Sequence, residues 1–332
     1  MNREKNQDIP KQAARQARIK KNLVFRSKTM GAVRQFFEES GFVEVETPLR
    51  LTAPAPEPHI DAVPSGDHYL QASPELHMKR LLCNGYDRIF QICKCFRQKE
   101  RGSRHLPEFT MLEWYAADAD YHFLMDQTEA MIGFVSKKTL GRQPVCVNDT
   151  VIDLAVPWRR MRVADAFSRY ADMDMESAVA NDCFEETLAF EIEPRLDTRV
   201  PVFLYDYPLK YTPLAKSTGE NGRAAQRFEL YLAGIEICNG YTELTDTETQ
   251  RSRFESELAA RKLMNRSFYP MPERFLADMV QMPDAAGCAL GLDRLVMILS
   301  GAGTIDDVTA FVPEDDRPWN EQEEEKATND AI

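Results

Sequence analysis

The sequence predicts a globular protein of the α+β class. Of its 332 residues, 43% are hydrophobic and 28% are charged, which supplies a sizeable core and argues against wholesale disorder. Segments with helical spacing of apolar residues alternate with short segments of strand character. Two pairs of strands are joined by a polar loop or a glycine turn, which predicts hairpins. The length corresponds to one large domain or two modest ones.

The first predicted elements are a helix and a strand. Residues 29–39 carry apolar side chains at helical spacing, and Gly41 supplies a stop. Residues 42–46 alternate as a strand, and Pro48 closes it because proline cannot donate a hydrogen bond to a neighbouring strand. Residues 52–58 are rich in proline and alanine, which predicts a loop.

The two patterns continue along the rest of the chain. Further strands are expected at residues 88–97, 109–116, 202–205, 225–232, 235–238 and 288–290. Further helices are expected at residues 74–82, 120–138, 162–169, 184–190, 250–265 and 293–299. The polar segment 98–108 forms a long hairpin loop, and Gly234 marks a second turn.

The two ends of the chain differ in charge from the body. Residues 1–28 hold nine basic and two acidic side chains, so this basic N-terminal arm is either a solvated, frayed terminus or a helix that contacts a partner. Residues 314–332 are acidic and poor in apolar residues, which predicts a disordered tail. Residues 29–313 are left as the folded body.

Charge and cysteine usage exclude several classes of protein. The net charge of −12 argues against a surface that coats nucleic acid, since that mode needs a basic face. No stretch approaches the ~20 apolar residues of a membrane span, and the N-terminus lacks the apolar segment of a secretion signal. The seven scattered cysteines fit a reducing cytoplasm better than a metal or redox site. We therefore expect a cytoplasmic protein.

Three segments together resemble the three motifs of class II aminoacyl-tRNA synthetases. They are GFVEVETPL (41–49), FRQKERGSRHLPEFTMLEWY (96–115) and ALGLDRLVMIL (289–299). The segments ASPELHMKRLL (72–82) and YDYPLKYTPLAK (205–216) narrow the resemblance to the lysyl branch, and it covers about residues 25–312. The resemblance implies a mainly antiparallel β-sheet flanked by helices, with residues 29–313 as the catalytic domain. It also implies a homodimer formed through the helix and strand of the first motif.

Two features resemble one group within this branch. Only about 28 residues stand before the motifs, so we expect no anticodon-binding module there, and Ala289 stands where lysyl-tRNA synthetases have glycine. Both are similar to the truncated lysyl-tRNA synthetase paralogues, which ligate lysine or β-lysine to a lysine of translation elongation factor P. An added methyl group in a substrate pocket changes preference by ~1–3 kcal/mol, which suffices to favour a differently shaped lysine isomer. The resemblance therefore implies ATP and Mg²⁺ as cofactors and elongation factor P as partner.

Two arginines are the candidate catalytic residues. When a carboxylate oxygen attacks ATP in line, positive charge must face the negative charge that develops on the α-phosphate. The planar fork of Arg97 can bridge two oxygens, and the resemblance assigns it to the α-phosphate and the substrate carboxylate. The resemblance assigns Arg294 to the γ-phosphate.

The second motif supplies the adenine site. The resemblance implies that adenine stacks on Phe109 and that the backbone of Leu106 contacts the adenine edge. It also implies that His105 lies near the phosphates. Lys99 stands where the family has glutamate, with Glu100 next to it, and Leu106 stands where the family has asparagine. Either Glu100 substitutes after a small register shift or ATP binds differently. The complete set of ATP-binding candidates is Arg97, Lys99, Glu100, His105, Leu106, Phe109, Glu236, Ile237, Gly291 and Arg294.

Three glutamates lie seven residues apart across the second predicted hairpin. The resemblance assigns Glu229 and Glu236 to Mg²⁺ and Glu243 to the amino acid. Magnesium usually takes one or two carboxylates together with phosphates and waters, so two glutamates are enough. Glutamates in a hairpin often form only a solvated face, but the apolar neighbours of Glu236 argue against that interpretation.

A substrate of the lysine type carries two ammonium groups, which need anionic partners. The resemblance assigns Glu75 to the amino group nearer the carboxylate, and Glu243 with Tyr115 to the side-chain ammonium. Ser73 is expected both in the substrate site and as a helix N-cap. The remaining substrate-binding candidates are Asn239 and Ala289.

The leading functional hypothesis is an ATP-dependent ligase that forms an adenylate of lysine or β-lysine and transfers it to elongation factor P. A minimal lysyl-tRNA synthetase is the alternative within the same class. A catalytically inactive synthetase-like binding protein is the alternative from another class, and Lys99 is the best argument for it. The acceptor amine must lose a proton before it attacks, and the sequence shows no dedicated base.

Overall fold

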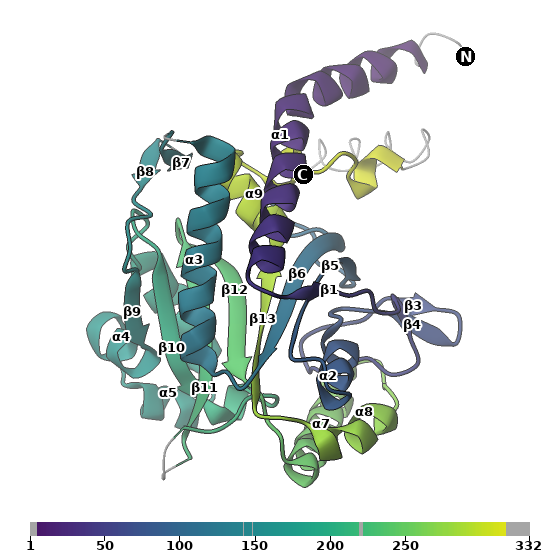
Figure 1. Cartoon of the computed structure of the whole chain (residues 1–332), viewed down its shortest axis with the longest axis vertical. Coiled ribbons are helices and arrows are strands. Elements are labelled where there is room, and N and C mark those ends of the chain that lie inside the picture. The colour runs from purple at the N-terminus through teal and green to yellow at the C-terminus, as the bar shows by residue number, and fades with distance from the viewer. Residues whose placement is uncertain (1–4, 142, 148, 219–221, 317–332) are drawn as a thin grey trace, which may run out of the picture.

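The core of the structure is an eight-stranded sheet (Figure 1). The computed structural model describes residues 5–316 except 142, 148 and 219–221. Among these residues, the edge pairs β1–β5 and β9–β10 are parallel, and all other neighbouring strands are antiparallel. The predicted fold, mainly antiparallel with flanking helices, is confirmed. In spatial order the strands are β1 (Val43–Glu44), β5 (Arg88–Phe96), β6 (Glu108–Ala117), β13 (Ala285–Gly291), β12 (Ile235–Thr242), β11 (Ala224–Leu232), β10 (Val202–Pro208) and β9 (Arg159–Arg162).

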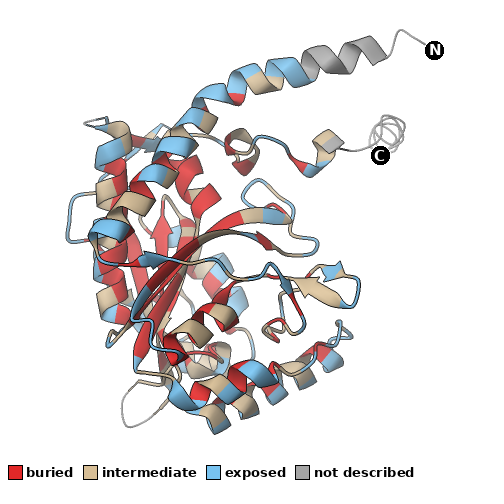
Figure 2. Cartoon of the chain, turned by 45° about the vertical axis from the view of Figure 1, so that its right-hand side comes forward, coloured by how far each residue is buried: buried red, intermediate tan, exposed pale blue. Residues whose placement is uncertain are grey.

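Helices surround this sheet. Helices α1, α3 and α9 share one apolar core with the sheet, α4 packs on β9 and β10, and α2, α7 and α8 lie together beyond the sheet (Figure 1). Buried residues concentrate in the strands and on the inner sides of the helices (Figure 2). The helices are α1 (Lys5–Glu39), α2 (Glu75–Cys83), α3 (Tyr121–Leu140), α4 (Val163–Tyr170), α5 (Met175–Ala180), α6 (Phe184–Thr187), α7 (Thr247–Leu263), α8 (Glu273–Asp278) and α9 (Leu292–Ser300).

Strand β6 shows how the sheet separates core from site. Because successive side chains of a strand point to opposite faces, alternate residues take different roles. Leu112, Trp114 and Ala116 are at most 1% exposed and belong to the core that α1, α3 and α9 cover. Glu113 and Tyr115 point to the other face, where they line a cavity. The alternation thus places Glu113 and Tyr115 on the cavity face and apolar side chains opposite them.

Most predicted elements are confirmed, with two differences near the first motif. Helix α1 begins at Lys5 instead of residue 29 and runs through residue 28 without a break. The strand expected at 42–46 is reduced to Val43–Glu44, because it lies at the sheet edge and pairs only with β5. Short strands that no pattern indicated complete the fold: β2 (Arg50–Leu51), β3 (Pro64–Ser65) and β4 (His68–Leu70) form one small sheet, and β7 (Val145–Val147) and β8 (Thr150–Ile152) form another.

Helix α1 lies against the rest of the chain through its basic residues. Arg26 forms an ion pair with the buried Asp293, at 2.5 Å, and donates a hydrogen bond to the hydroxyl of Thr110 at 2.8 Å. Arg15 donates to the carbonyl of Ala310 at 2.8 Å. This part of the basic arm therefore contacts the body of the protein itself. The division expected at residue 28 does not coincide with the end of an element.

The described C-terminal end is a short 3-10 helix, Pro313–Asp316. The rest of the predicted disordered tail, residues 317–332, lies outside the described residues. Among the residues that the structure describes, no helix combines the length and the apolar character needed to cross a bilayer.

Phe37 should be a main contributor to the core. It is fully buried and stacks on Phe90, with ring centroids 4.8 Å apart. Its ring centroid lies 5.4 Å from that of Trp114. We expect Phe37→Ala to lower the free energy of unfolding by about 3–5 kcal/mol, because it removes these contacts and leaves a cavity. Phe190→Ala is the matched control, since Phe190 is 77% exposed and its loss should change stability by less than about 0.5 kcal/mol. Urea denaturation measures both variants, and equal losses would contradict this account of the core.

Candidate active site

Two rows of residues on neighbouring strands form the floor of the candidate site. Strand pairing places Glu113 opposite Ala289, Ala289 opposite Asn239, and Asn239 opposite Glu229. One step along the strands, the same pairing aligns Tyr115, Gly287, Tyr241 and Arg227. Because residues two apart on a strand share a face, both rows point to the same side of the sheet. Antiparallel register thus brings together residues that are distant in the sequence.

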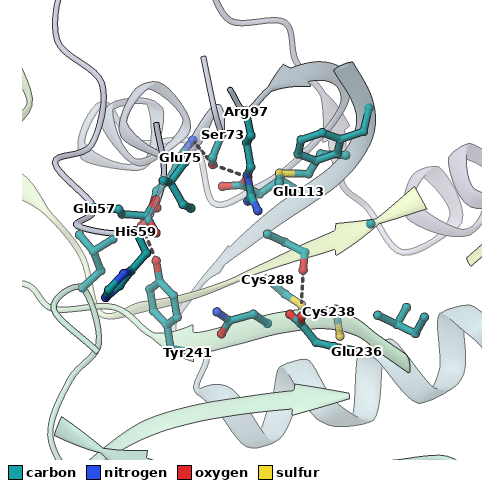
Figure 3. A pocket seen from close by; sticks show the side chains of 18 of the residues that line it. Glu57, His59, Ser73, Glu75, Arg97, Glu113, Glu236, Cys238, Tyr241 and Cys288 are labelled. Carbon is teal, nitrogen blue, oxygen red and sulfur yellow. Dashed lines mark hydrogen bonds between the residues drawn. The ribbon is translucent and has the colours of Figure 1, made fainter. Parts of the chain in front are cut away.

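A cavity of about 410 Å³ lies over this floor (Figure 3). The loop after β5 and the loop around Glu57 form part of its wall. Its lining includes most of the residues predicted from sequence: Ser73, Glu75, Arg97, Glu100, His105, Leu106, Phe109, Tyr115, Glu236, Ile237, Asn239, Ala289, Gly291 and Arg294. Lys99, Glu229 and Glu243 are not among the residues that line it in the described part of the chain.

Gly287 lets the substrate-binding candidates approach one another. A Cβ atom at this position would lie 2.2 Å from the ring of Tyr115 and 2.6 Å from Oε1 of Glu243, distances that no carbon atom can occupy. Only glycine therefore allows the Tyr115 ring and the Glu243 carboxylate to lie side by side over the strand. The structure thus brings together the two groups that the sequence assigned to one ammonium.

A buried lysine joins the two carboxylates assigned to the substrate. Lys79 Nζ lies 2.5 Å from Oε1 of Glu75 and 2.6 Å from Oε2 of Glu243. Lys79 is only 2% exposed. The Tyr241 hydroxyl also donates a hydrogen bond to Glu75. Glu75 and Glu243 thus hold one ammonium group between them, which shows that this end of the site suits a cation.

Burial and charge shift the pKa values of this group in a consistent way. Burial disfavours the charged form of Lys79, but the nearby Glu243 and Glu75 outweigh it and raise the pKa of the ammonium. Burial raises the pKa of Glu243 to about 8, with Lys79 acting in the opposite direction and Glu75 adding to the rise. Lys79 is thus held charged, and without it both carboxylates would lose their compensating cation.

Glu113 is a second buried carboxylate in the floor. It accepts hydrogen bonds from the hydroxyl of Tyr115 and, at 2.7 Å, from that of Ser73. Burial raises its pKa to about 8, and Glu75 adds to this rise. Ser73 also accepts a hydrogen bond from the backbone N–H of Glu75 at 3.0 Å, but the N-cap of α2 is Pro74 and not Ser73 as predicted, because the helix begins only at Glu75. The hydroxyl therefore connects the start of α2 to the floor.

Arg97 and Arg294 also line the cavity. The Arg97 guanidinium lies over the Phe109 ring, 5.1 Å from its centroid, and 3.8 Å from Oε2 of Glu100. Its Nε atom is buried, and no described residue accepts a hydrogen bond from it. The Arg97 side chain is 25% exposed, so the rest of its guanidinium can bind an anion in the cavity. Glu100, and not Lys99, lines the cavity beside Arg97.

Arg294 lines the same cavity. It donates to the carbonyl of Glu236 at 2.8 Å and lies 3.3 Å from Oε2 of that residue. Its other terminal nitrogen is 2.5 Å from Nε2 of His105. Burial, together with the charge of Arg294, lowers the pKa of His105 and favours its neutral form. Two arginines and a neutral histidine therefore face the space expected for the phosphates.

The two expected magnesium ligands differ in availability. The Glu236 side chain is 41% exposed and lines the cavity. Glu229 is 8% exposed and accepts hydrogen bonds from Arg227 at 2.5 Å and from Tyr207 at 2.7 Å. Among the described residues, no group of three or more His, Cys, Asp or Glu residues is arranged to hold a metal. Glu236 is the more accessible ligand and has Arg294 as its partner, whereas the buried Glu229 would have to release stronger donors.

Sequence reasoning missed several residues of the site. Two of them could have been predicted from spacing. Glu113 is two residues before Tyr115 on a strand, so both share a face, and Lys79 is four residues after Glu75 on a helix, so both share a side. Tyr241 likewise precedes Glu243 by two residues. Glu57 lies in a loop without periodicity, so no pattern could have placed it in the wall.

The fold and the site together define a catalytic domain of the class II synthetase type. A model of the family described as tRNA synthetases class II (D, K and N) matches residues 6–315, so the chain belongs to this family.

Relatives of two kinds share about a third of the sequence. The chain is 37% identical over 311 residues to the elongation factor P–(R)-β-lysine ligase of Sodalis glossinidius, covering 88% of this chain and 95% of that one. It is 36% identical over 313 residues to the ligase of the same name from Edwardsiella ictaluri, covering 87% and 94%. It is 35% identical over 319 residues to the lysine–tRNA ligase of Moorella thermoacetica, covering 88% of this chain and 65% of that one.

Lys79→Met tests the role of the buried cation. We expect the free energy of unfolding to fall by about 3–5 kcal/mol, because two buried carboxylates lose their counter-ion. The loss should be smaller near about pH 5 than near about pH 8, since the pKa of Glu243 is raised by burial and the carboxyl can bind a proton in the folded state at the lower pH. Urea denaturation at both pH values measures this difference.

The neighbouring residue provides the control. Arg80 pairs with Asp278 at 2.5 Å, but both side chains are about a third exposed, so Arg80→Met should cost at most about 1 kcal/mol. If the two variants lose equal stability, Lys79 does not compensate a buried charge.

Proposed function

We propose that this protein activates lysine or (R)-β-lysine with ATP and transfers it to a lysine side chain of elongation factor P. The observation that carries the proposal is that one cavity combines an ammonium-binding pair of carboxylates with arginine side chains. Glu75 and Glu243 already hold an ammonium group, and Arg97 and Arg294 line the same cavity. An amino acid with an extra ammonium group would bind at the carboxylates, next to a nucleotide whose phosphates face the arginines.

The side chains of the cavity suit carboxylate activation. The Arg97 fork can hold the substrate carboxylate and the α-phosphate together, and Arg294 can hold the γ-phosphate. The free face of the Phe109 ring suits adenine, since Arg97 lies over the ring. Magnesium would neutralise the phosphates from Glu236, with Glu229 as the second candidate ligand.

Three observations favour elongation factor P over tRNA as acceptor. The ligases that act on elongation factor P match the chain along nearly their whole length. The net charge of −12 disfavours binding of a polyanion such as tRNA, because like charges repel. Ala289 adds a methyl group to the floor between Glu113 and Asn239, where the substrate would lie.

The exposed β1 edge supports the homodimer proposed from the first motif. Val43 is 55% exposed and Leu49 is 43% exposed, and β1 has a neighbouring strand on one side only. The dimer and the cytoplasmic location both stay predictions.

Mass spectrometry of the acceptor tests the function. Purified elongation factor P and tRNA specific for lysine are offered together with ATP and either lysine isomer. We expect a mass increase of one lysyl group on elongation factor P and negligible charging of the tRNA. Label found chiefly on tRNA would favour a minimal lysyl-tRNA synthetase. Absence of lysine-dependent ATP–pyrophosphate exchange in folded protein would favour a binding protein without activity.

Ala289→Gly tests how the floor selects between lysine isomers. Removing the methyl group should change the ratio of kcat/KM for β-lysine to that for lysine by about 10- to 200-fold, the range expected for one methyl group in a pocket. ATP–pyrophosphate exchange with each isomer measures the ratio. Ala286→Gly is the control, because Ala286 points to the core face and should leave the ratio unchanged even if stability falls. An unchanged ratio in Ala289→Gly would show that residues other than Ala289 determine which lysine isomer is preferred.

A further inference from the structure

Glu57 is a carboxylate of the cavity wall that the activation step leaves without a role. It lies in the loop between β2 and β3 and lines the cavity together with Glu75 and Arg97. Figure 3 draws it beside Glu75 and His59 at one side of the cavity. Its charge is felt by groups from four segments: Arg97 after β5, Glu75 in α2, Arg227 in β11 and Glu257 in α7.

Hydrogen bonds from Arg261 fix the backbone of this loop. The buried Arg261 donates hydrogen bonds to the carbonyl of Glu57 at 2.6 Å and to that of Ile60 at 2.8 Å. The same guanidinium is paired with Asp61 at 2.8 Å and lies over the Tyr269 ring. Three contacts from one buried side chain fix the position of the loop, so Glu57 is presented to the cavity from a rigid support.

The carboxylate of Glu57 is available in a way that its neighbours are not. Glu75 and Glu243 share the Lys79 ammonium, and Glu113 accepts two hydroxyl groups. Within the described part of the chain, no residue donates a hydrogen bond to the side chain of Glu57. This carboxylate can therefore accept a proton from a molecule that enters the cavity.

The surroundings of Glu57 give it the proton affinity of a base that works near neutral pH. Burial raises its pKa to about 7, Arg97 and Arg227 lower it, and Glu75 and Glu257 raise it further. General bases are most effective when their pKa lies near the working pH. A lysine amine has a pKa near about 10.4, so at neutral pH it needs such a base before it can act as a nucleophile.

We propose that the Glu57 carboxylate is the base that takes a proton from the acceptor's lysine ammonium during aminoacyl transfer. This inference rests on the proposed function. The neutral amine nitrogen then forms a bond to the carbonyl carbon of the adenylate, and the bond from that carbon to the phosphate oxygen breaks. AMP leaves with the electron pair, and the second proton of the new amide nitrogen goes to the departing phosphate. No oxidant or reductant is needed.

Position distinguishes Glu57 from the groups that bind the substrate's own ammonium groups. Those are assigned to Glu75 and Glu243, which surround a cation deep in the floor. Glu57 instead adjoins His59, whose side chain is 58% exposed, so it lies toward the side from which a protein side chain can enter. Arg97, the residue assigned to the carboxylate that is attacked, is one of the charges that act on Glu57.

Glu57→Gln separates this role from activation, because glutamine keeps the shape of the side chain and loses only the basicity. We expect lysine-dependent ATP–pyrophosphate exchange within about twofold of the wild type, which also shows that the variant is folded. Single-turnover transfer from the preformed adenylate to elongation factor P should fall by about 10²- to 10⁴-fold. Glu57→Asp, which retains a carboxylate, should recover part of that loss.

The pH profile provides a readout that a structural role would not change. Wild-type transfer should rise as pH increases through about 7, where Glu57 loses its proton and becomes a base, since burial raises its pKa to this value. In Glu57→Gln that rise should disappear, and the rate should increase only toward the pKa of the free amine, near about 10.4.

Glu185→Gln is the matched control. Its side chain is 61% exposed beside His59, so this variant removes a negative charge near the same loop without removing the proposed base. We expect unchanged transfer at saturating acceptor. An increase in the KM for lysine during exchange by Glu57→Gln, or transfer within twofold of the wild type, would overturn the assignment. If wild-type protein performs exchange but never modifies elongation factor P, the proposed function itself fails.

Discussion

The site depends on one electrostatic constraint, which is that carboxylates buried on the face of a sheet need a compensating cation. Glu75 and Glu243 come from a helix and from the end of a strand, and each is nearly inaccessible to water. The Lys79 ammonium satisfies both, so the acidic end of the cavity can exist before any substrate arrives. A substrate ammonium then enters a site in which the carboxylates already have fixed positions, and little binding energy is spent on arranging them.

The antiparallel register is what gives this constraint its geometry. Residues from β6, β13, β12 and β11 form two straight rows, and small residues occupy the places where large ones from adjacent strands must meet. Gly287 is such a place, since any side chain there would displace the Tyr115 ring or the Glu243 carboxylate. The floor is therefore as sensitive to the positions without side chains as to those that carry charge.

Periodicity explains which parts could be predicted from the sequence. The hairpins could be predicted because the polar segment 98–108 and Gly234 separate runs of strand character, whereas the face of the sheet that lines the cavity could not, since β6 and β12 are largely buried on both faces. The sequence allowed a helix in the N-terminal arm but did not decide between it and a frayed terminus, because the basic residues of the arm are held by Asp293 and Ala310, more than 250 positions away. Glu57 was equally hidden, since a buried arginine on a distant helix positions its loop. The conformations of the N-terminal arm and of the Glu57 loop depend on contacts between distant segments, which local sequence patterns do not predict.

The contact of Arg26 with Asp293 has a consequence for the N-terminal segment. Asp293 is only 3% exposed, and it is the neighbour of Arg294 at the start of α9. It also accepts the backbone N–H of Thr110, the residue after Phe109. Removing the first 28 residues would therefore uncover a buried acid between the two segments that bracket the nucleotide end of the cavity. A part of the chain that looks dispensable in a comparison of motifs is in fact a component of the active-site scaffold.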